Sequence, residues 1–155
     1  GYDRGHMAPS YGIDTRYGRD AQVETYLMSN ITPQIPLLNR YLWKDLEMMI
    51  AKRWADELEE VWVYTGPVFL GERDTLTSGV EIPDAFYKIL ADETEQGTFR
   101  VLCFLVPAKP VPDSPLEQFL VPVDSVEALT GFDFFEQWPD DWEQTLETRA
   151  AGALW

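Results

Sequence analysis

The sequence predicts an α+β domain in which one long amphipathic helix packs against a mostly antiparallel sheet. Apolar residues recur at helical spacing over residues 37–60. Four candidate strands follow, and the last two are joined by residues 92–98, whose composition is typical of a hairpin connection. The length of 155 residues is about that of one domain, so we expect a single domain over residues 1–155.

The segment before the helix carries few regular patterns. Residues 1–20 are expected to be irregular, because glycines and a proline interrupt any period. Residues 23–29 fit either a short strand or a helical turn. Two prolines favour an extended chain from Asn30 to Pro36. The helix of residues 37–60 then turns one apolar stripe to the core, formed by Leu38, Leu42, Leu46, Met49, Ile50, Trp54 and Leu58.

The segment after the helix alternates between strand and turn patterns. Strands are predicted at residues 61–66, 67–71, 86–91 and 99–106, and a proline-rich loop at 107–115. A short helix is predicted at residues 124–130 with Asp124 or Ser125 as its N-cap, and a terminal helix at 139–150. The single cysteine, Cys103, lies in an apolar run and is expected to be buried, which excludes an intrachain disulfide and a cysteine-based zinc site.

The net charge of −15 is unevenly distributed. Residues 1–53 hold seven basic and six acidic residues, whereas residues 54–155 hold five basic and 21 acidic ones. The total argues against a nucleic-acid partner, but the first third of the chain is about neutral and does not. No apolar run reaches the ~18 residues of a membrane span, so we expect no membrane partner, and the chain opens without the apolar segment of a signal peptide.

Three polar residues in the neutral segment are candidates for chemistry. His6 has a side chain whose usual pKa suits general base catalysis, although a surface-loop histidine without a role fits the same pattern. Asn39 and Glu47 are eight residues apart, which on a helix separates them by ~80° of azimuth and ~12 Å along the axis. They could line one site for Mg²⁺. The alternatives are a helix N-cap for Asn39 and a solvated or ion-paired side chain for Glu47.

Several segments, taken in order, resemble the family of DNA/RNA non-specific endonucleases of the ββα-metal type. They are residues 3–6 (Asp-Arg-Gly-His), residues 29–34 (Ser-Asn-Ile-Thr-Pro-Gln) and Asn39 with Trp43 and Glu47. Residues 64–68, 82–88 and 129–135 extend the resemblance over most of the chain. It implies a ββα-metal nuclease fold and a single nuclease domain over residues 1–155.

The resemblance also implies roles for five residues. His6 would be the general base that activates water, and Asn39 the direct protein ligand of one Mg²⁺, with Mn²⁺ or another divalent ion as substitutes. Glu47 would hold metal-bound water, Asn30 would shape the site by hydrogen bonding, and Arg4 would contact phosphate. The implied reaction is Mg²⁺-dependent hydrolysis of phosphodiester bonds in DNA and RNA to 5′-phosphate ends.

The sequence departs from the family on its N-terminal side, where the family has further strands and a further arginine. We therefore expect a second polypeptide or a longer chain to supply those strands. A second copy in a homodimer and an inhibitor protein are the other candidate partners, and relatives are secreted, periplasmic or mitochondrial. Two alternative functions remain, namely an inactive nucleic-acid-binding or assembly module of this fold, and a phosphodiesterase that acts on smaller esters.

Overall fold

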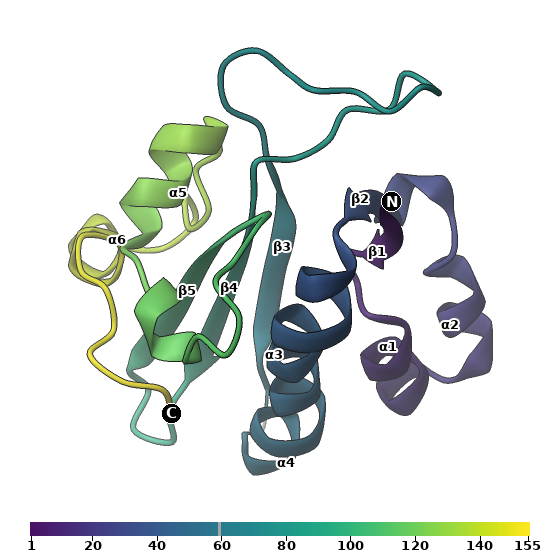
Figure 1. Ribbon diagram of the computed structural model, residues 1–155. Helices are drawn as coiled ribbons and strands as arrows, with labels where there is room; N and C mark the ends of the chain where they lie inside the picture. Colours follow the sequence, from purple (N-terminus) through teal and green to yellow (C-terminus); the bar gives the residue numbers. More distant parts are fainter. Residues whose placement is uncertain (59) are drawn as a thin grey trace.

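A three-stranded antiparallel sheet forms the centre of the computed structural model, which describes residues 1–58 and 60–155 and not the side chain of Asp140 (Figure 1). Its strands are β3 (Trp62–Val68), β4 (Ala85–Glu93) and β5 (Phe99–Pro107), in the spatial order β3-β4-β5. The register pairs Val63 with Leu90 and Phe86 with Val106. Within the described residues β3 has a partner strand along one edge only.

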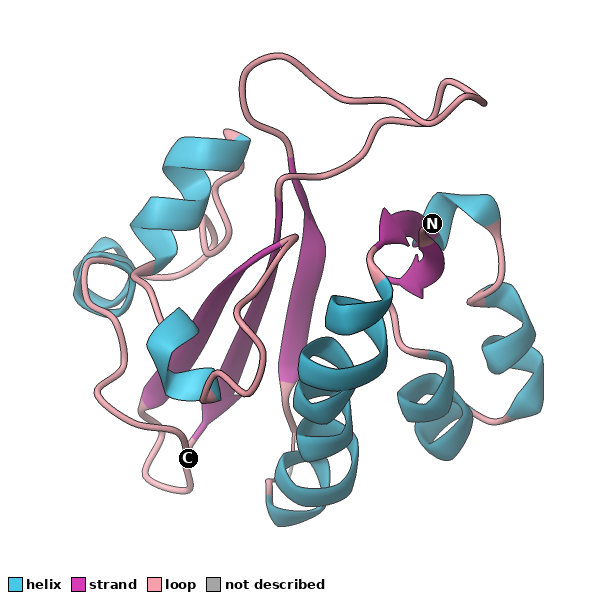
Figure 2. Cartoon of the chain, in the orientation of Figure 1, coloured by secondary structure: helices cyan, strands magenta, loops and turns pink. Residues whose placement is uncertain are grey.

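The middle strand β4 is buried on both of its faces, because helices cover the sheet from either side (Figure 2). Side chains alternate across a strand. Phe86 and Leu90 therefore join the core on the face of the long helix, while Tyr87 and Ile89 join the core on the opposite face. The molecule thus has three layers, helix on sheet on helix, and Lys88 falls at a position that points into the first core.

The long helix predicted at residues 37–60 is confirmed, but it ends at Glu57. It runs without interruption through η2 (Leu38–Leu42), α3 (Trp43–Met49), η3 (Ile50–Trp54) and α4 (Ala55–Glu57). The segments η2 and η3 are wider π-type turns. The helix ends where Leu58 becomes extended, and Glu59 lies outside the described residues. Its buried stripe is Leu38, Trp43, Leu46 and Trp54.

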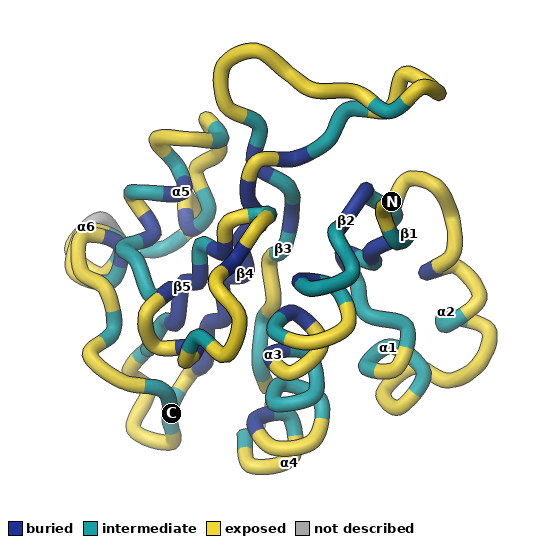
Figure 3. Tube along the Cα trace, viewed as in Figure 1, coloured by how far each residue is buried: buried dark blue, intermediate teal, exposed yellow. Residues whose placement is uncertain are grey.

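The prediction of an irregular chain over residues 1–20 is wrong. The first residues form β1 (Asp3–His6), which pairs antiparallel with β2 (Ile31–Gln34), and between them lie α1 (Ser10–Tyr17), α2 (Arg19–Glu24) and η1 (Met28–Asn30). The hydrophobic pattern does not indicate β1, because the strand is only four residues long and its partner strand is distant in sequence. The helices α1 and α2 bury no residue, as Figure 3 shows, so they have no apolar stripe to detect.

The other element predictions are largely confirmed. Residues 23–29 take the helical alternative, the chain at 31–34 is extended, and the strands at 61–66, 86–91 and 99–106 are present with the hairpin between the last two. The strand predicted at residues 67–71 is wrong, since β3 absorbs its first two residues and the chain then leaves the sheet. No helix in the described part of the chain is long and apolar enough to cross a membrane.

The C-terminal third contributes to both faces of the sheet, since Leu116 and Phe119 pack in the core beside the long helix, and Val123 and Val126 pack in the core on the opposite face. After the loop of residues 108–115 come η4 (Leu116–Phe119), α5 (Val123–Thr130) and α6 (Asp140–Glu147). The N-cap of α5 is Pro122 and no side chain caps the helix, so the prediction of Asp124 or Ser125 is wrong. The fixed φ of proline suits the start of a helix. Cys103 is buried as predicted, and burial raises the pKa of its thiol to about 12.

Candidate functional site

Strand β1 holds two of the candidate residues in place. Arg4 is exposed, and alternation along the strand puts it on the same face as His6. Gly5 between them is required, because an added Cβ would overlap the side chain of Gln34 on β2. The imidazole of His6 meets the ring of Tyr26 edge-on, with 4.9 Å between ring centroids.

The environment of His6 favours its neutral form. Its Nε2 atom is buried and has no hydrogen-bond partner in the described part of the chain. Burial also lowers the pKa of His6 below its usual value of 6.5. A neutral imidazole near pH 7 can accept a proton, so the side chain is suited to general base catalysis.

Asn30 fixes the chain that follows His6. Its Oδ1 accepts a hydrogen bond from the backbone N–H of Ala8 (2.8 Å), and its Nδ2 donates to the carbonyls of Ala8 (3.0 Å) and Thr25 (2.8 Å). The backbone carbonyl of Asn30 accepts a further bond from Met7. The amide is therefore engaged by the main chain on both sides, and its effect is to position the end of β1.

Asp3 connects β1 to the first turn of the long helix. Arg40 donates from Nε and Nη2 to the two carboxylate oxygens of Asp3, at 2.7 and 2.6 Å, and Asn39 donates from Nδ2 to Oδ2 at 3.0 Å. These hydrogen bonds, with that from Arg40 the largest influence, lower the pKa of Asp3. Asn39 lies inside the helix, because residues 36 and 37 are already helical, so the alternative interpretation of Asn39 as an N-cap is wrong.

The bond from Asn39 to Asp3 determines which atom of the amide is free. Because the NH₂ group is held by the carboxylate, the carbonyl oxygen Oδ1 is left as an acceptor, and no described residue donates to it. A neutral amide oxygen is a hard ligand of the kind that Mg²⁺ accepts. The donor atom and its orientation therefore fit a divalent cation beside η2.

Glu47 lies deeper, where α3 packs on the sheet. Its Oε1 atom is buried without a hydrogen-bond partner in the described residues. Burial is the largest influence and raises the pKa of Glu47 to about 7, while the charge of Lys88 and the side chain of Trp43 act in the opposite direction. A divalent cation nearby would act in the same direction as Lys88. Glu47 is therefore neither a solvated side chain nor a member of a direct ion pair among the described residues.

Lys88 is a further candidate residue, which the motif does not include. Its side chain is fully buried, and its Nζ lies 4.6 Å from the centre of the Trp43 ring. Burial lowers the pKa of Lys88 to about 8, and the charge of Glu47 opposes that shift. A cation–π contact and a facing carboxylate are what an ammonium in a core needs. The available signal was a lysine at the middle of an apolar strand, between the inward-facing Phe86 and Leu90.

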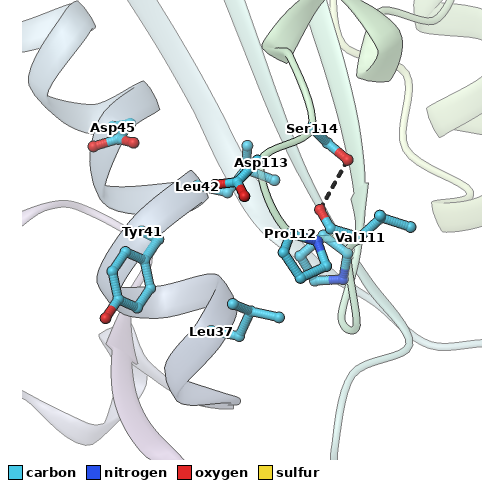
Figure 4. Close-up of a pocket in the computed structure, with 9 residues that line it drawn as sticks. Leu37, Tyr41, Leu42, Asp45, Val111, Pro112, Asp113 and Ser114 are labelled. Carbon is cyan, nitrogen blue, oxygen red and sulfur yellow. Dashed lines mark hydrogen bonds between the residues drawn. The ribbon is translucent and has the colours of Figure 1, made fainter.

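The structure brings some of the candidates together and leaves others unconnected. Asp3 and Asn39 bind each other directly, and Asn30 binds the segment after His6. No hydrogen bond among the described residues joins His6 to Asn39 or Glu47. A pocket of about 240 Å³ next to Tyr41 and Asp45, shown in Figure 4, contains none of the candidate residues and is separate from this site.

The sequence of residues 1–141 matches the profile of the family described as DNA/RNA non-specific endonuclease. The chain belongs to this family. Human mitochondrial endonuclease G is 32% identical over 146 residues, which cover 86% of this chain and 48% of the human protein. A nuclease of Syncephalastrum racemosum is 31% identical over 156 residues, which cover 88% of this chain and 48% of that nuclease.

A solved structure supports the same assignment at the level of fold. The crystal structure of the EndoG/EndoGI complex, concerned with the mechanism of EndoG inhibition, matches with a TM-score of 0.81 and 30% sequence identity. The match covers 92% of this chain and 62% of that chain. The predicted ββα-metal nuclease fold is confirmed. The chain spans about half the length of the curated relatives named above.

Proposed function

We propose that this chain contains the catalytic centre of a metal-dependent nuclease that hydrolyses phosphodiester bonds of DNA and RNA. The observation that carries the proposal is the bond from Asn39 to Asp3, because it leaves the amide oxygen free to bind a metal next to the strand that holds His6. Membership of the endonuclease family and the likeness to named nucleases support it.

The proposed reaction uses His6 as the general base that takes a proton from the attacking water. Asn39 would provide the direct protein ligand for Mg²⁺, and Glu47 would hold water on the ion. When bound, the ion would stabilise the charge that develops on the phosphate and on the leaving 3′-oxygen. The guanidinium of Arg4 pairs with phosphate, for which its fork of donors is suited. Such a reaction leaves 5′-phosphate ends.

Asn30 and Asp3 act by positioning in this proposal. Asn30 holds the backbone on the C-terminal side of His6, and Asp3 holds the amide of Asn39. Contacts made mainly to phosphate carry no sequence information, so we expect cleavage with little sequence preference.

The test is a cleavage assay with the full-length protein on plasmid DNA, on RNA and on a small phosphodiester. We expect cleavage of both polymers with Mg²⁺ and none with excess EDTA. Polymer binding without cleavage in Mg²⁺ or Mn²⁺ would overturn the proposal in favour of a binding module. Turnover of the small ester without cleavage of the polymers would overturn it in favour of a smaller-ester phosphodiesterase.

The pH dependence of cleavage should report the neutral form of His6. Since burial lowers the pKa of His6, the unprotonated base persists to lower pH than usual, and activity should fall only below pH 6.5. Saturating Mg²⁺ would keep Glu47 ionised, so log(kcat/KM) is then expected to decline with a slope of about 1 on the acid side, as His6 alone is protonated. A midpoint above 6.5, or no acid limb, would contradict this assignment.

Lys88→Met should reduce cleavage without unfolding the protein. Methionine fits the apolar surroundings of Lys88, and Glu47 can take up a proton once the facing ammonium is gone, so we expect a lower Tm but a folded protein. Glu47 would lose the charge that opposes its protonation. A rise of one unit in its pKa, from about 7, would reduce the carboxylate form at pH 7 by about fivefold, and hence the rate.

The loss in Lys88→Met should shrink as the pH is raised, because Glu47 then ionises unaided. Initial rates from pH 6 to 9, with thermal melting as a check on folding, measure this. Lys44→Met is the matched control, since Lys44 is an exposed lysine on α3, the helix that carries Glu47. An equal loss at every pH would show that Lys88 does not act through the charge of Glu47.

The same proposal names three protein partners. Because the neighbouring solved structure is a complex of EndoG with EndoGI, an inhibitor of that kind is a candidate partner that would compete with substrate. A second copy of the chain is the second candidate, and a segment that supplies further strands is the third. Binding of EndoGI to this chain and loss of cleavage on its addition would test the first of them.

A further inference from the structure

Three carboxylates meet between α5 and α6, on the far side of the sheet from β1 and the long helix (Figure 1). Asp124 and Glu127 are three residues apart on α5 and so share one face of that helix. Glu147 comes from the last turn of α6. One carboxylate oxygen from each residue lies within 4.8 Å of the other two. The fold therefore concentrates three like charges at a point where two helices touch.

Glu147 is the member that an ordinary solvated cluster does not explain. Its side chain is only 6% exposed, and its Oε1 atom is buried with no hydrogen-bond partner in the described part of the chain. Burial, the largest influence, and repulsion from nearby carboxylates together raise the pKa of Glu147 to about 7; these carboxylates are Glu127, Glu143, Asp124 and Asp133. A buried oxygen that faces other carboxylates is favourable only with a proton or a cation between them.

Glu127 is held in place by the backbone, whereas Asp124 is exposed. The backbone N–H of Phe134 donates to Glu127 Oε1 at 2.9 Å, which orients that carboxylate. Val123 and Val126 anchor the same turn of α5 in the core below the sheet. None of the three carboxylates takes part in an ion pair with a described basic side chain. The cluster is thus a set of oxygen donors that no described lysine or arginine neutralises.

We propose that Asp124, Glu127 and Glu147 bind a hard divalent cation of the Ca²⁺ class, and that this ion ties α6 to α5. Three carboxylates with no nitrogen or sulfur donor suit Ca²⁺, Mn²⁺ or Mg²⁺, and the flexible geometry of Ca²⁺ suits ligands from two helices. The site is separate from the metal proposed at Asn39. Its effect is on stability, so it stands independently of the proposed reaction.

The test is thermal melting and calorimetric titration of the full chain with CaCl₂, after removal of divalent ions. We expect saturating Ca²⁺ to raise the Tm by about 5 °C. Glu147→Gln keeps the size of the side chain but loses a ligand charge, so its Tm should not respond. Asn39→Ala removes the other proposed ligand and should respond as the original protein does.

Glu95→Gln is the matched control, because it removes one exposed acidic charge from the β4–β5 connection. It should show the full Ca²⁺ response, which separates binding from general screening of the negative charge. The proposal is overturned if the original chain does not respond to millimolar Ca²⁺, or if Glu147→Gln responds equally. A response that disappears in Asn39→Ala and persists in Glu147→Gln overturns it as well.

A measurement on the unaltered chain covers the case in which Glu147→Gln does not fold. Mn²⁺ broadens the NMR signals of nearby amides, so substoichiometric Mn²⁺ should broaden signals from residues 123–134 and 141–148. Broadening confined to residues 3–6 and 38–47 would place the only bound ion at the Asn39 site and overturn the proposal.

Discussion

Replacing His6 by alanine is expected to lower the single-turnover rate of DNA and RNA cleavage by about 10²- to 10⁴-fold, the range that general base catalysis contributes. His6 is the only histidine in the chain, and its imidazole is neutral near pH 7 because burial lowers its pKa. The ring is only partly buried and has an edge-on contact with Tyr26, so truncation should leave the fold intact. Rates at saturating Mg²⁺, together with a melting curve, measure the effect.

Two controls make the His6 result specific. Tyr17→Ala truncates a largely exposed aromatic ring on α1, and its rate should stay near that of the original protein. The Mg²⁺ concentration for half-maximal rate should be unchanged in His6→Ala, since the histidine is not a proposed ligand. If His6→Ala cleaved at the same rate as the original protein, His6 would not be the base.

Asp3→Ala should raise the Mg²⁺ concentration needed for half-maximal rate by about 10- to 100-fold, the usual cost of losing a group that orients a metal ligand. Without the carboxylate, the amide of Asn39 can rotate and present its NH₂ group to the ion. The carboxylate also receives both bonds from Arg40, so its loss frees two side chains. A Mg²⁺ titration of the initial rate is the measurement.

Arg40→Met separates the two consequences of the Asp3 change. It removes the arginine bonds but leaves the bond from Asn39 to Asp3, so it should shift the Mg²⁺ dependence much less than Asp3→Ala. The account of Asn39 would be wrong if both variants shifted it equally. It would also be wrong if Asp3→Ala lost activity that no Mg²⁺ concentration restored.

The sequence predicted the parts of the fold that have a repeating pattern. The long helix carries an apolar stripe, and β4 and β5 are mostly apolar, so all three were recognisable. The N-terminal helices α1 and α2 were not, because they bury no side chain and rest on single contacts such as the ion pair of Arg16 with Asp56. Local patterns report burial, and these elements have little.

The candidate site was predictable as far as its residues form a motif. Resemblance to the family supplied His6, Asn30, Asn39 and Glu47 without their contacts. The partner of Asn39 could not be deduced, because the four-residue strand that brings Asp3 to η2 has no pattern of its own. Lys88 was also missed, since its role depends on which face of β4 meets Trp43.

The acidic residues behind the net charge of −15 are unevenly placed in the structure. Much of the excess acid lies after residue 53, and three of those carboxylates converge between α5 and α6, away from β1 and Asn39. The acidic part of the chain is therefore largely separate from the candidate site. Because few phosphates would be neutralised, we expect nucleic-acid binding to depend weakly on salt.

The most direct test of the central claim is a crystal structure of the protein with Mn²⁺, with anomalous scattering used to locate the ion. We predict an anomalous peak for an ion about 2.1 Å from Oδ1 of Asn39, with waters between the ion and Glu47. We also predict that the Asn39 amide still donates to Asp3. An ion that is bonded to His6 instead, or a fully saturated protein with no peak at Asn39, would contradict the claim.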